Sequence, residues 1–498
     1  MKPVGAPPAM SRRTMLAGAA ALAPLALARR THAQSAPRPA PVLPLAERLA
    51  RYADRLRFED LDAAAIEAVK VHFIDTLGCG IAAFAERPVR ICRDIALAGG
   101  GGTATVIGTA RRTSGELATF ANGAAFRYYD LNDIYVHRQG SHPSDHIAAC
   151  LAVAEAERAS AHDLITAIVL AYEINCRLVD AVDLSTGGWD PPVLSLPAVA
   201  LAAGKLMKLG PDKLTQAVNL AINDHIPMFQ TRVQTLSDWK GLADAEAGRN
   251  AVFAALLARG GITGPAPIFE GRAGFFKQVS GPVTIDVDAF GGRGIPFKVT
   301  QCNMKAYPAV VYAQTAIAAG IAVAKEVGDL KRIAAIEIAT TSRGFQAAGS
   351  EPEKWAPATR ATADHSLPYT VAWAMVDGEI TNATYAPAKL HDPAILAFMR
   401  KIKVHEDPAL TARMGAAVPN RLTAILDDGR RVTREVDAVP GFAGMPMGRA
   451  DVERKFRGNV RDCWPQGRAD GILRTLWQLD SVPEISQFLG SLALQAGP

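Results

Sequence analysis

The stretch from residue 147 to residue 259 constrains the fold most, because it consists of long alanine- and leucine-rich runs without intervening strands. Apolar residues recur there at helical spacing. This spacing predicts helices over residues 147–156, 162–182, 194–206, 213–222 and 245–259. Ser160 and Pro211 stand where two of these helices should begin. Since strands do not alternate with the helices, a doubly wound nucleotide-binding sheet is disfavoured, and we expect an α-helical domain.

Two further helices are expected earlier in the chain. Leu45, Leu49, Tyr52 and Leu56 recur at helical spacing, and Asp62 is suited to cap the helix that follows. Asp75 lies inside the apolar run of that second helix, so we interpret it as a buried, paired acid with a structural role.

The pattern changes near residue 300. Residues 335–340 (AIEIAT) favour a strand, and residues 421–436 alternate around Asp428 and Gly429 as a β-hairpin does. Helical runs at residues 310–326 and 369–376 accompany them. These features predict a smaller α+β domain.

The predicted fold class is therefore mainly α with an inserted α+β domain. We place the helical domain at residues 45–298 and the α+β domain at residues 299–444. Residues 445–498 return to helix and are expected to pack on the helical domain again.

The N-terminal residues resemble a twin-arginine export signal. Residues 1–33 contain Arg12 and Arg13, an apolar run and a small-residue stretch that ends at Ala33. A membrane anchor is the alternative, but the run is shorter than the roughly 20 residues that span a bilayer. We predict a periplasmic or secreted protein that has no stable membrane association after cleavage. Residues 34–44 are proline-rich and predict an extended linker.

The same N-terminal residues account for the positive charge of the chain. The sequence has 54 Lys and Arg against 49 Asp and Glu. Subtracting the five basic residues of positions 1–33 leaves 49, so the remaining chain has a formal net charge of zero. The charge therefore predicts no binding to nucleic acid.

The cysteines and glycines argue against common cofactor sites. The six cysteines are scattered without a C-x-x-C pair, which disfavours a zinc or iron–sulfur site and names no disulfide. The glycines at residues 99–102 are not followed by the helix that a nucleotide loop requires, so we interpret them as a turn.

Titratable side chains crowd into the segment from residue 127 to residue 146. Gly140 and Pro143 break any helix, so the segment is predicted to be a loop between two apolar helices. A loop on a rigid scaffold is a common place for catalytic groups, although a solvated surface loop has the same composition. The titratable residues are Asp130, Asp133, Asp145, His137, His142 and His146.

Two lysines could supply cations to the same site. Lys240, in LSDWKG, and Lys305, in NMKAYPA, each follow a helix break and precede a helical run, although surface solvation is the usual fate of a lysine. Together with His142 they suit the removal of a proton beside a carboxylate. Motifs for a serine nucleophile or a metalloprotease are absent from the sequence. We interpret the isolated histidines His72, His162, His225, His391 and His405 as structural.

Several long segments, taken in order from about residue 45 to the C-terminus, resemble the MmgE/PrpD family. The matching segments include AVKVHFIDTLGCGIAA, FANGAAFRYYDLNDIYVHRQGSHPSD, LSDWKGLADAEAGRN, KAYPAVVYAQTA, ADHSLPYTVAWAMVDGEIT and GMPMGRADVERKF. The resemblance implies a helical domain, a smaller lid domain, a homodimer and no metal or organic cofactor. It also implies a small-molecule carboxylate substrate.

The resemblance implies catalytic positions as well. It assigns His142 as general acid/base, Lys240 and Lys305 as carboxylate binders, and Asp130 as an orienting group or proton relay. The further residues that we expect to bind substrate are Asp133, Ser144, Asp190 and Tyr307.

Three departures from the decarboxylase-like members narrow the expected reaction. Ile134 stands where those members have Thr, and Asp190 and Val310 stand where they have His. The resemblance therefore implies a cofactor-independent dehydratase that eliminates water from a hydroxy di- or tricarboxylate such as 2-methylcitrate. An isomerase, epimerase or decarboxylase, and an exported carboxylate-binding protein without catalysis, are the alternatives.

Overall fold

A computed structural model describes residues 43–223, 225–415 and 417–494. The predicted export signal and nearly all of the proline-rich segment lie outside the described residues. Within the described part, no single helix is long and apolar enough to cross a membrane, and one sharply bent helix pair passes that test only jointly.

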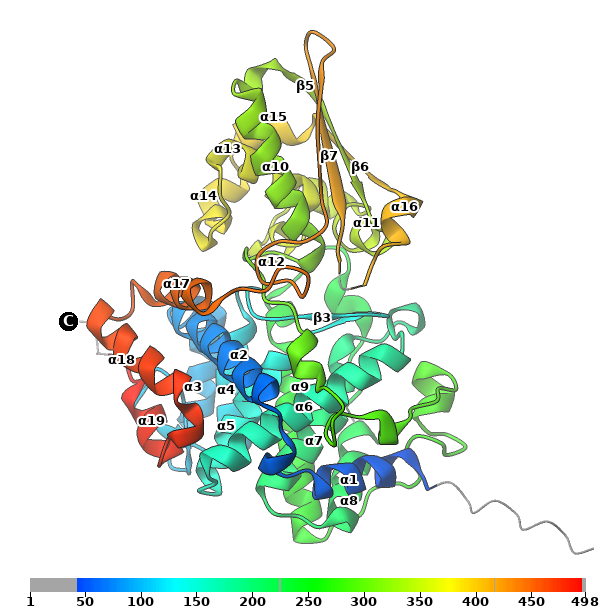
Figure 1. The fold of residues 1–498 in the computed structure, drawn as a ribbon, viewed down its shortest axis with the longest axis vertical. Coiled ribbons are helices and arrows are strands. Elements are labelled where there is room, and N and C mark those ends of the chain that lie inside the picture. Colours follow the sequence, from blue (N-terminus) through cyan, green and yellow to red (C-terminus); the bar gives the residue numbers. More distant parts are fainter. Residues whose placement is uncertain (1–42, 224, 416, 495–498) are drawn as a thin grey trace, which may run out of the picture. The chain divides into compact units, whose positions relative to one another are not determined.

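Helices make up most of the described chain (Figure 1). The helices of the first half are α1 (Leu45–Arg55), α2 (Ala63–Ala82), α3 (Arg87–Ala98), α4 (Gly115–Arg127), α5 (Ile147–Ala156), α6 (Ala161–Ala181), α7 (Ser195–Leu206), α8 (Pro211–Asn223) and α9 (Ala243–Gly260). All seven helices predicted for this half are confirmed, with ends that differ by a few residues. Apolar side chains from all of these helices except α3 contribute to one large buried cluster, in which α7 packs against α6, α8 and α9, and the buried apolar residues of α3 belong to smaller clusters.

The predicted helix starts are confirmed by their capping contacts. The side chain of Asp62 accepts a hydrogen bond from the amide of Ala65, and Ser160 accepts one from the amide of Asp163. Pro211 is the first residue of α8, where its missing N–H costs no helical hydrogen bond.

A four-stranded sheet forms the centre of the second half, with the strand order β6-β5-β7-β8. The strands are β5 (Ile333–Thr340), β6 (Ile402–Glu406), β7 (Asn420–Leu426) and β8 (Arg431–Val436). The β5–β6 pair is parallel and the other two pairs are antiparallel. The predicted hairpin is therefore confirmed, and Gly429 at its turn has a φ of 82°, which glycine adopts without strain.

Helices of the second half pack beside this sheet. The long α10 (Gln314–Val327) contacts β7, β8 and α13 (Leu367–Asp377), and Figure 1 shows it between α13 and β7. The shorter helices are α11 (Ser342–Ala348), α12 (Arg360–Ala363), α14 (Pro387–Leu390), α15 (Pro393–Met399) and α16 (Pro408–Thr411). Apolar side chains of these helices, except α16, and of the sheet form a second buried cluster, which also includes Ile134 and Val136 from the first half.

The tail packs on the first half of the chain. Its helices are α17 (Arg449–Val460), α18 (Gln466–Trp477) and α19 (Ile485–Ser491). In Figure 1 they lie beside α2 and α3, and α17 and α18 contact α2 directly. Lys455 of α17 reaches Asp75 of α2, with Nζ 2.6 Å from Oδ1, so Asp75 is the buried, paired acid that was expected. The domain boundaries themselves stay predictions.

Candidate active site

The segment after α4 is a loop, as its glycine and proline predicted. It contains only the two-residue strands β3 (Tyr135–Val136) and β4 (Gly140–Ser141) before a short 3₁₀ turn. A second pair of such strands, β1 (Ala104–Thr105) and β2 (Arg112–Thr113), precedes α4. Asp130 has a φ of 51°, a left-handed conformation that aspartate tolerates better than most residues. This turn directs its carboxylate into the protein, where it is 1% exposed.

Three cations surround the carboxylate of Asp130. Its Oδ1 lies 2.8 Å from Nζ of Lys305 and 3.3 Å from Nζ of Lys240, and Arg127 donates a hydrogen bond to the same oxygen. Burial alone would raise the pKa of Asp130, but Arg127, Lys240 and Lys305 hold it well below the ordinary value. The structure therefore brings three of the four predicted catalytic residues into direct contact.

Burial lowers the pKa of both lysines, and Asp130 offsets only part of that effect. The pKa of Lys240 falls to about 7 and that of Lys305 to about 8. Both amino groups can therefore exchange a proton near neutral pH.

Backbone contacts between distant segments hold the two lysines in place. Ile134 and Asn303 exchange two backbone hydrogen bonds of 2.8 Å, which fixes the segment of Lys305 against the loop of Asp130. Nζ of Lys305 also donates to the backbone oxygen of Asp130 at 2.9 Å. Lys240 lies in a 3₁₀ turn, Asp238–Gly241, directly before α9.

His142 is fixed by hydrogen bonds at both ring nitrogens. Nδ1 lies 2.7 Å from the backbone oxygen of Asp133, which can only accept, so Nδ1 carries the proton. Nη2 of Arg127 lies 2.8 Å from Nε2, and a guanidinium can only donate, so Nε2 accepts. Burial and the neighbouring Arg127 lower the pKa of His142 well below its ordinary value, which keeps the ring neutral.

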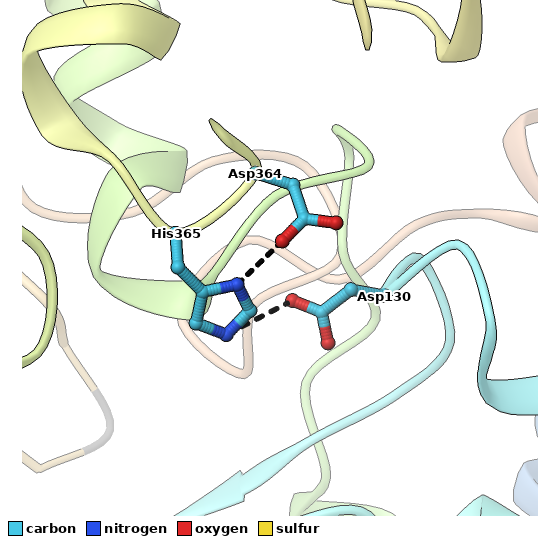
Figure 2. Close-up of side chains that lie close together, drawn as sticks. All are labelled: Asp130, Asp364 and His365. Atoms are coloured by element: carbon cyan, nitrogen blue, oxygen red, sulfur yellow. Dashed lines mark hydrogen bonds and ion pairs between the residues drawn. The ribbon is translucent and has the colours of Figure 1, made fainter. Parts of the chain in front are cut away.

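A second histidine, His365, faces the same carboxylate from the other half of the chain (Figure 2). Its Nδ1 lies 2.5 Å from Oδ1 of Asp364, and its Nε2 lies 3.9 Å from Oδ2 of Asp130. Burial, and then the charge of Lys240, lower the pKa of His365 to about 4. The sequence analysis did not single out His365, although the ADHSLPY segment that contains it was among the matching motifs.

The three acidic and imidazole groups in Figure 2 could in principle ligate a cation, since their ligand atoms lie within 4.8 Å of one another. Arg127, Lys240 and Lys305 already neutralise Asp130, so a metal ion at this point would face three positive charges. The charge around these groups suits an anionic ligand better than a metal ion.

A cavity of about 570 Å³ opens beside these groups. Its polar wall includes Arg127, Asp130, Gln139, His142, Arg232, Asp244, Lys305, Arg343 and His365. Its apolar wall includes Ile134, Pro191, Phe229, Val233, Val310 and Val311. The cavity therefore combines a cation-rich side with an apolar side, and a volume of this size holds a small organic molecule.

Asp133, Ser144, Asp190 and Tyr307 are absent from the lining of this cavity among the described residues. Asp133 accepts hydrogen bonds from the amide of Ser144 at 3.0 Å and from the hydroxyl of Tyr172 at 2.8 Å, so its geometry is that of a group that orders the loop. The hydroxyl oxygen of Ser144 accepts a hydrogen bond from Asn132. Both side chains therefore take part in hydrogen bonds that hold the loop.

Asp190 and Tyr307 lie behind the cavity wall. Asp190 is buried and accepts a hydrogen bond of 2.7 Å from Nε of Arg232, which itself lines the cavity. The amide of Tyr307 donates to the side chain of Gln314, and the tyrosine ring is half-buried. Direct contact with substrate stays a prediction for Asp133, Ser144, Asp190 and Tyr307.

Arg127 is the other central residue that sequence analysis did not assign. Besides Asp130 and His142, its guanidinium lies 3.4 Å from Asp145 and 4.0 Å from Asp244, and its side chain is 1% exposed. A buried arginine with this many carboxylates holds the loop and α9 together. The group of acidic residues that follows Arg127 in the sequence could have indicated that this arginine is buried among carboxylates.

Two family models match most of the chain. The MmgE/PrpD N-terminal domain matches residues 47–288, and the MmgE/PrpD C-terminal domain matches residues 307–480. The chain belongs to the MmgE/PrpD family. Most of the cavity lining comes from these two matched regions, with Lys305 just between them.

Curated members of the MmgE/PrpD family align over most of the chain. A 2-methylcitrate dehydratase from Cupriavidus necator is 27% identical over 476 residues, which cover 88% of this chain and 95% of that protein. A 2-methylcitrate dehydratase from Salmonella typhimurium is 27% identical over 84% of this chain and 90% of its own length. A cis-aconitate decarboxylase-like protein from Aspergillus oryzae, oryM, is 24% identical over 89% and 96%.

Proposed function

We propose that this protein is a cofactor-independent lyase that eliminates water from a hydroxy di- or tricarboxylate, with 2-methylcitrate as the leading substrate. Membership of the MmgE/PrpD family and the relatives named 2-methylcitrate dehydratase support a hydro-lyase of this type. The observation that carries the proposal is the group of Arg127, Lys240 and Lys305 beside a cavity large enough for such an acid.

The charges of the site suit proton removal beside a carboxylate. When a carbon next to a carboxylate loses a proton, negative charge develops on the carboxylate oxygens, and preset donors stabilise it. Lys305 lines the cavity, while Lys240 lies behind Asp130 and adds positive charge from the buried side. In this arrangement Asp130 orients the two ammonium groups.

The apolar wall supports a substrate that carries an apolar substituent. Ile134 and Val310 present hydrocarbon to the cavity at two positions where the decarboxylase-like members are expected to have hydrogen-bonding side chains. A methyl group against this wall would be removed from water, which favours binding by about 0.8 kcal/mol for each buried CH₂-sized group. We therefore favour 2-methylcitrate over citrate, and dehydration over decarboxylation.

Incubation of the purified protein with 2-methylcitrate tests the proposal. We expect a product that is lighter by one water in mass spectrometry, and a higher kcat/KM than with citrate or malate. Deuterium incorporation from solvent into recovered substrate without an alkene product would instead identify an epimerase. Loss of carbon dioxide would identify a decarboxylase, and binding without any chemical change would identify a carboxylate-binding protein.

Lys305→Met provides a matched test of the binding role. Methionine keeps the apolar length of the side chain but removes the positive charge, so we expect KM for 2-methylcitrate to rise at least tenfold. Lys331→Met on the exposed turn before β5 is the control and should leave the kinetics unchanged. An unchanged KM in Lys305→Met would contradict the role of Lys305 as a carboxylate binder.

We further propose that the protein is exported and acts as a homodimer. The sequence of residues 1–33 supports export, and the resemblance to the MmgE/PrpD family supports the dimer. Fractionation of cells that express the full chain, and sedimentation of the purified protein, test the two points separately.

A further inference from the structure

We propose that His365, held by Asp364, is the catalytic base that takes the substrate proton. This inference rests on the proposed function, because it names the group that performs its central step. It changes the expected role of His142, which becomes a neutral partner that orients Arg127.

The hydrogen bonds of His365 leave one ring nitrogen able to accept a proton. Nδ1 faces the carboxylate of Asp364 at 2.5 Å and must donate to it. The other nitrogen, Nε2, therefore carries the lone pair. Its nearest charged oxygen, Oδ2 of Asp130, is 3.9 Å away, beyond hydrogen-bond distance, and that oxygen accepts no hydrogen bond within the described part of the chain.

The geometry of His142 is the opposite. Its Nε2 already accepts a hydrogen bond from Arg127 at 2.8 Å, so a proton could be added there only by breaking this contact. The resulting imidazolium would then lie beside a guanidinium, which is electrostatically unfavourable. Although His142 also lines the cavity, its lone pair is occupied.

Lys240 is a poorer candidate for the catalytic base than His365. Its side chain is 2% exposed, and it is absent from the cavity lining among the described residues. The side chain of His365 is 12% exposed and lines the cavity. A group that takes a proton from substrate must touch it, and of these two only His365 is placed to do so.

The backbone around His365 is fixed from both halves of the chain. The amide of Val310 donates to the backbone oxygen of Asp364 at 2.8 Å, and Ser366 caps α13 directly after His365. On the other side, Thr359 and Thr362 of the α12 region bond to the backbone of Leu236, just before Lys240. His365 is therefore a positioned group on a rigid turn, as a general base requires.

In the proposed elimination, His365 is the only side chain whose protonation state must change. Nε2 takes the proton from the carbon beside the carboxylate, and the C–H electron pair forms the second bond of the alkene. The C–O bond to the neighbouring hydroxyl breaks, and its electron pair stays on oxygen. The imidazolium of His365 returns the proton to this oxygen, directly or through Lys305, so that water leaves and the neutral histidine is restored. Asp364 stabilises the imidazolium while it exists.

Kinetics of His365→Gln with 2-methylcitrate test this assignment. We expect kcat to fall by about 10²- to 10⁴-fold, the usual contribution of a general base, while KM changes less than about threefold. His391→Gln, at an exposed position, is the control and should retain the wild-type rate. A kcat within threefold of wild type in His365→Gln would overturn the proposal.

Chemical rescue separates a catalytic from a structural role. In His365→Gly, added imidazole can occupy the vacated space and should restore part of kcat, whereas His142→Gly should gain nothing. Circular dichroism verifies that both variants are folded. Rescue of His142→Gly alone would assign the base to His142 instead.

A substrate-independent measurement keeps the inference distinct from the proposed function. Diethyl pyrocarbonate acylates neutral imidazole nitrogens that have a free lone pair, and peptide mass spectrometry locates the product. We expect His365 to react faster than His142 in the native protein. Faster reaction of His142 would contradict the geometry, whereas a wild-type protein that is inactive on 2-methylcitrate would refute only the proposed function.

Discussion

Replacement of Asp130 by asparagine should expose how strongly the site depends on one buried carboxylate. The substitution keeps the shape of the side chain and removes its charge, while Arg127, Lys240 and Lys305 remain buried around it. The carboxylate lies 2.8 and 3.3 Å from the two ammonium nitrogens. At an effective dielectric constant of about 20, unit charges at these distances attract each other by about 5–6 kcal/mol per pair.

Most of that attraction offsets the cost of burying the charges, so the net effect is smaller than the sum. Removing one partner from a buried ion group typically costs about 3–5 kcal/mol, and we expect Asp130→Asn to lose this much of the free energy of unfolding at pH 6. Since proteins of this kind are stable by about 5–15 kcal/mol, the variant should still fold. Guanidinium denaturation followed by circular dichroism measures the difference.

The loss should become smaller as the pH rises. The pKa values of Lys240 and Lys305 in the wild type are about 7 and 8, so both lysines are largely neutral at pH 9 and Asp130 then has only Arg127 as a charged partner. Asp130 raises the pKa of both lysines, so these pKa values lie lower still in the variant, which therefore loses more stability than the wild type as the pH falls from 9 to 6. The unfolding free energies of the two proteins should therefore differ more at pH 6 than at pH 9.

Asp427→Asn is the matched control, because Asp427 forms an exposed ion pair with Arg332 at 3.2 Å. It should cause no measurable loss at either pH. A loss below about 1 kcal/mol for Asp130→Asn at pH 6, or a loss that does not change with pH, would refute the view that this carboxylate compensates three buried cations.

Four other substitutions test further buried polar groups. His146 is buried with no hydrogen-bond partner for either ring nitrogen among the described residues, and burial lowers its pKa to about 3, so its stabilising contribution is present above pH 6.5 and declines as the pH falls toward 3. His146→Leu should reduce the slope of the unfolding free energy against pH by up to about 1.4 kcal/mol per pH unit in the acid range. The same slope in wild type and variant between pH 6.5 and pH 4.5 would contradict this. Asp133→Asn leaves Tyr172 and the loop amide with a weaker acceptor and should cost about 1–3 kcal/mol, measured by urea denaturation, whereas Tyr172→Phe should cost less. Lys455→Met leaves Asp75 buried without its partner and should lower the free energy of unfolding by about 3–5 kcal/mol near neutral pH. The loss should be smaller at pH 4, because burial raises the pKa of Asp75 and the acid can then take up a proton.

The predicted helices of the first half are confirmed because their signals are local. Asp62 and Ser160 satisfy helix N-termini within three residues of themselves, and the apolar spacing that they precede lies in one continuous stretch. The apolar helix expected before the loop is α4, although its bounds were not predicted. Gly123 lies inside this helix, and an added Cβ there would lie 3.0 Å from the Cβ of Ala245, so this glycine serves the close approach of α4 and α9.

In the candidate site too, residues that are close in the sequence could be predicted, whereas contacts between distant segments could not. Asp130 and His142 stand out because titratable residues crowd into one loop, and the structure places both at the cavity. His365 and Asp364 come from the other half of the chain, and their relation to Asp130 arises only when the two halves meet. No spacing within the sequence reveals a contact of that kind, and the same holds for the hydrogen bond of Arg127 to the ring of His142.

The contact made by Lys455 also has a consequence for the order in which the protein matures. Besides Asp75, its ammonium group donates to the backbone oxygen of Leu131 at 2.9 Å, in the residue directly after Asp130. Both contacts are made by α17, which is translated after the residues that line the cavity. A nascent chain still attached to the ribosome can therefore contain Asp130, Lys240, Lys305 and His365 before Lys455 can bind the loop of Asp130. Maturation of the pocket would then be a post-translational event, timed by the emergence of the tail.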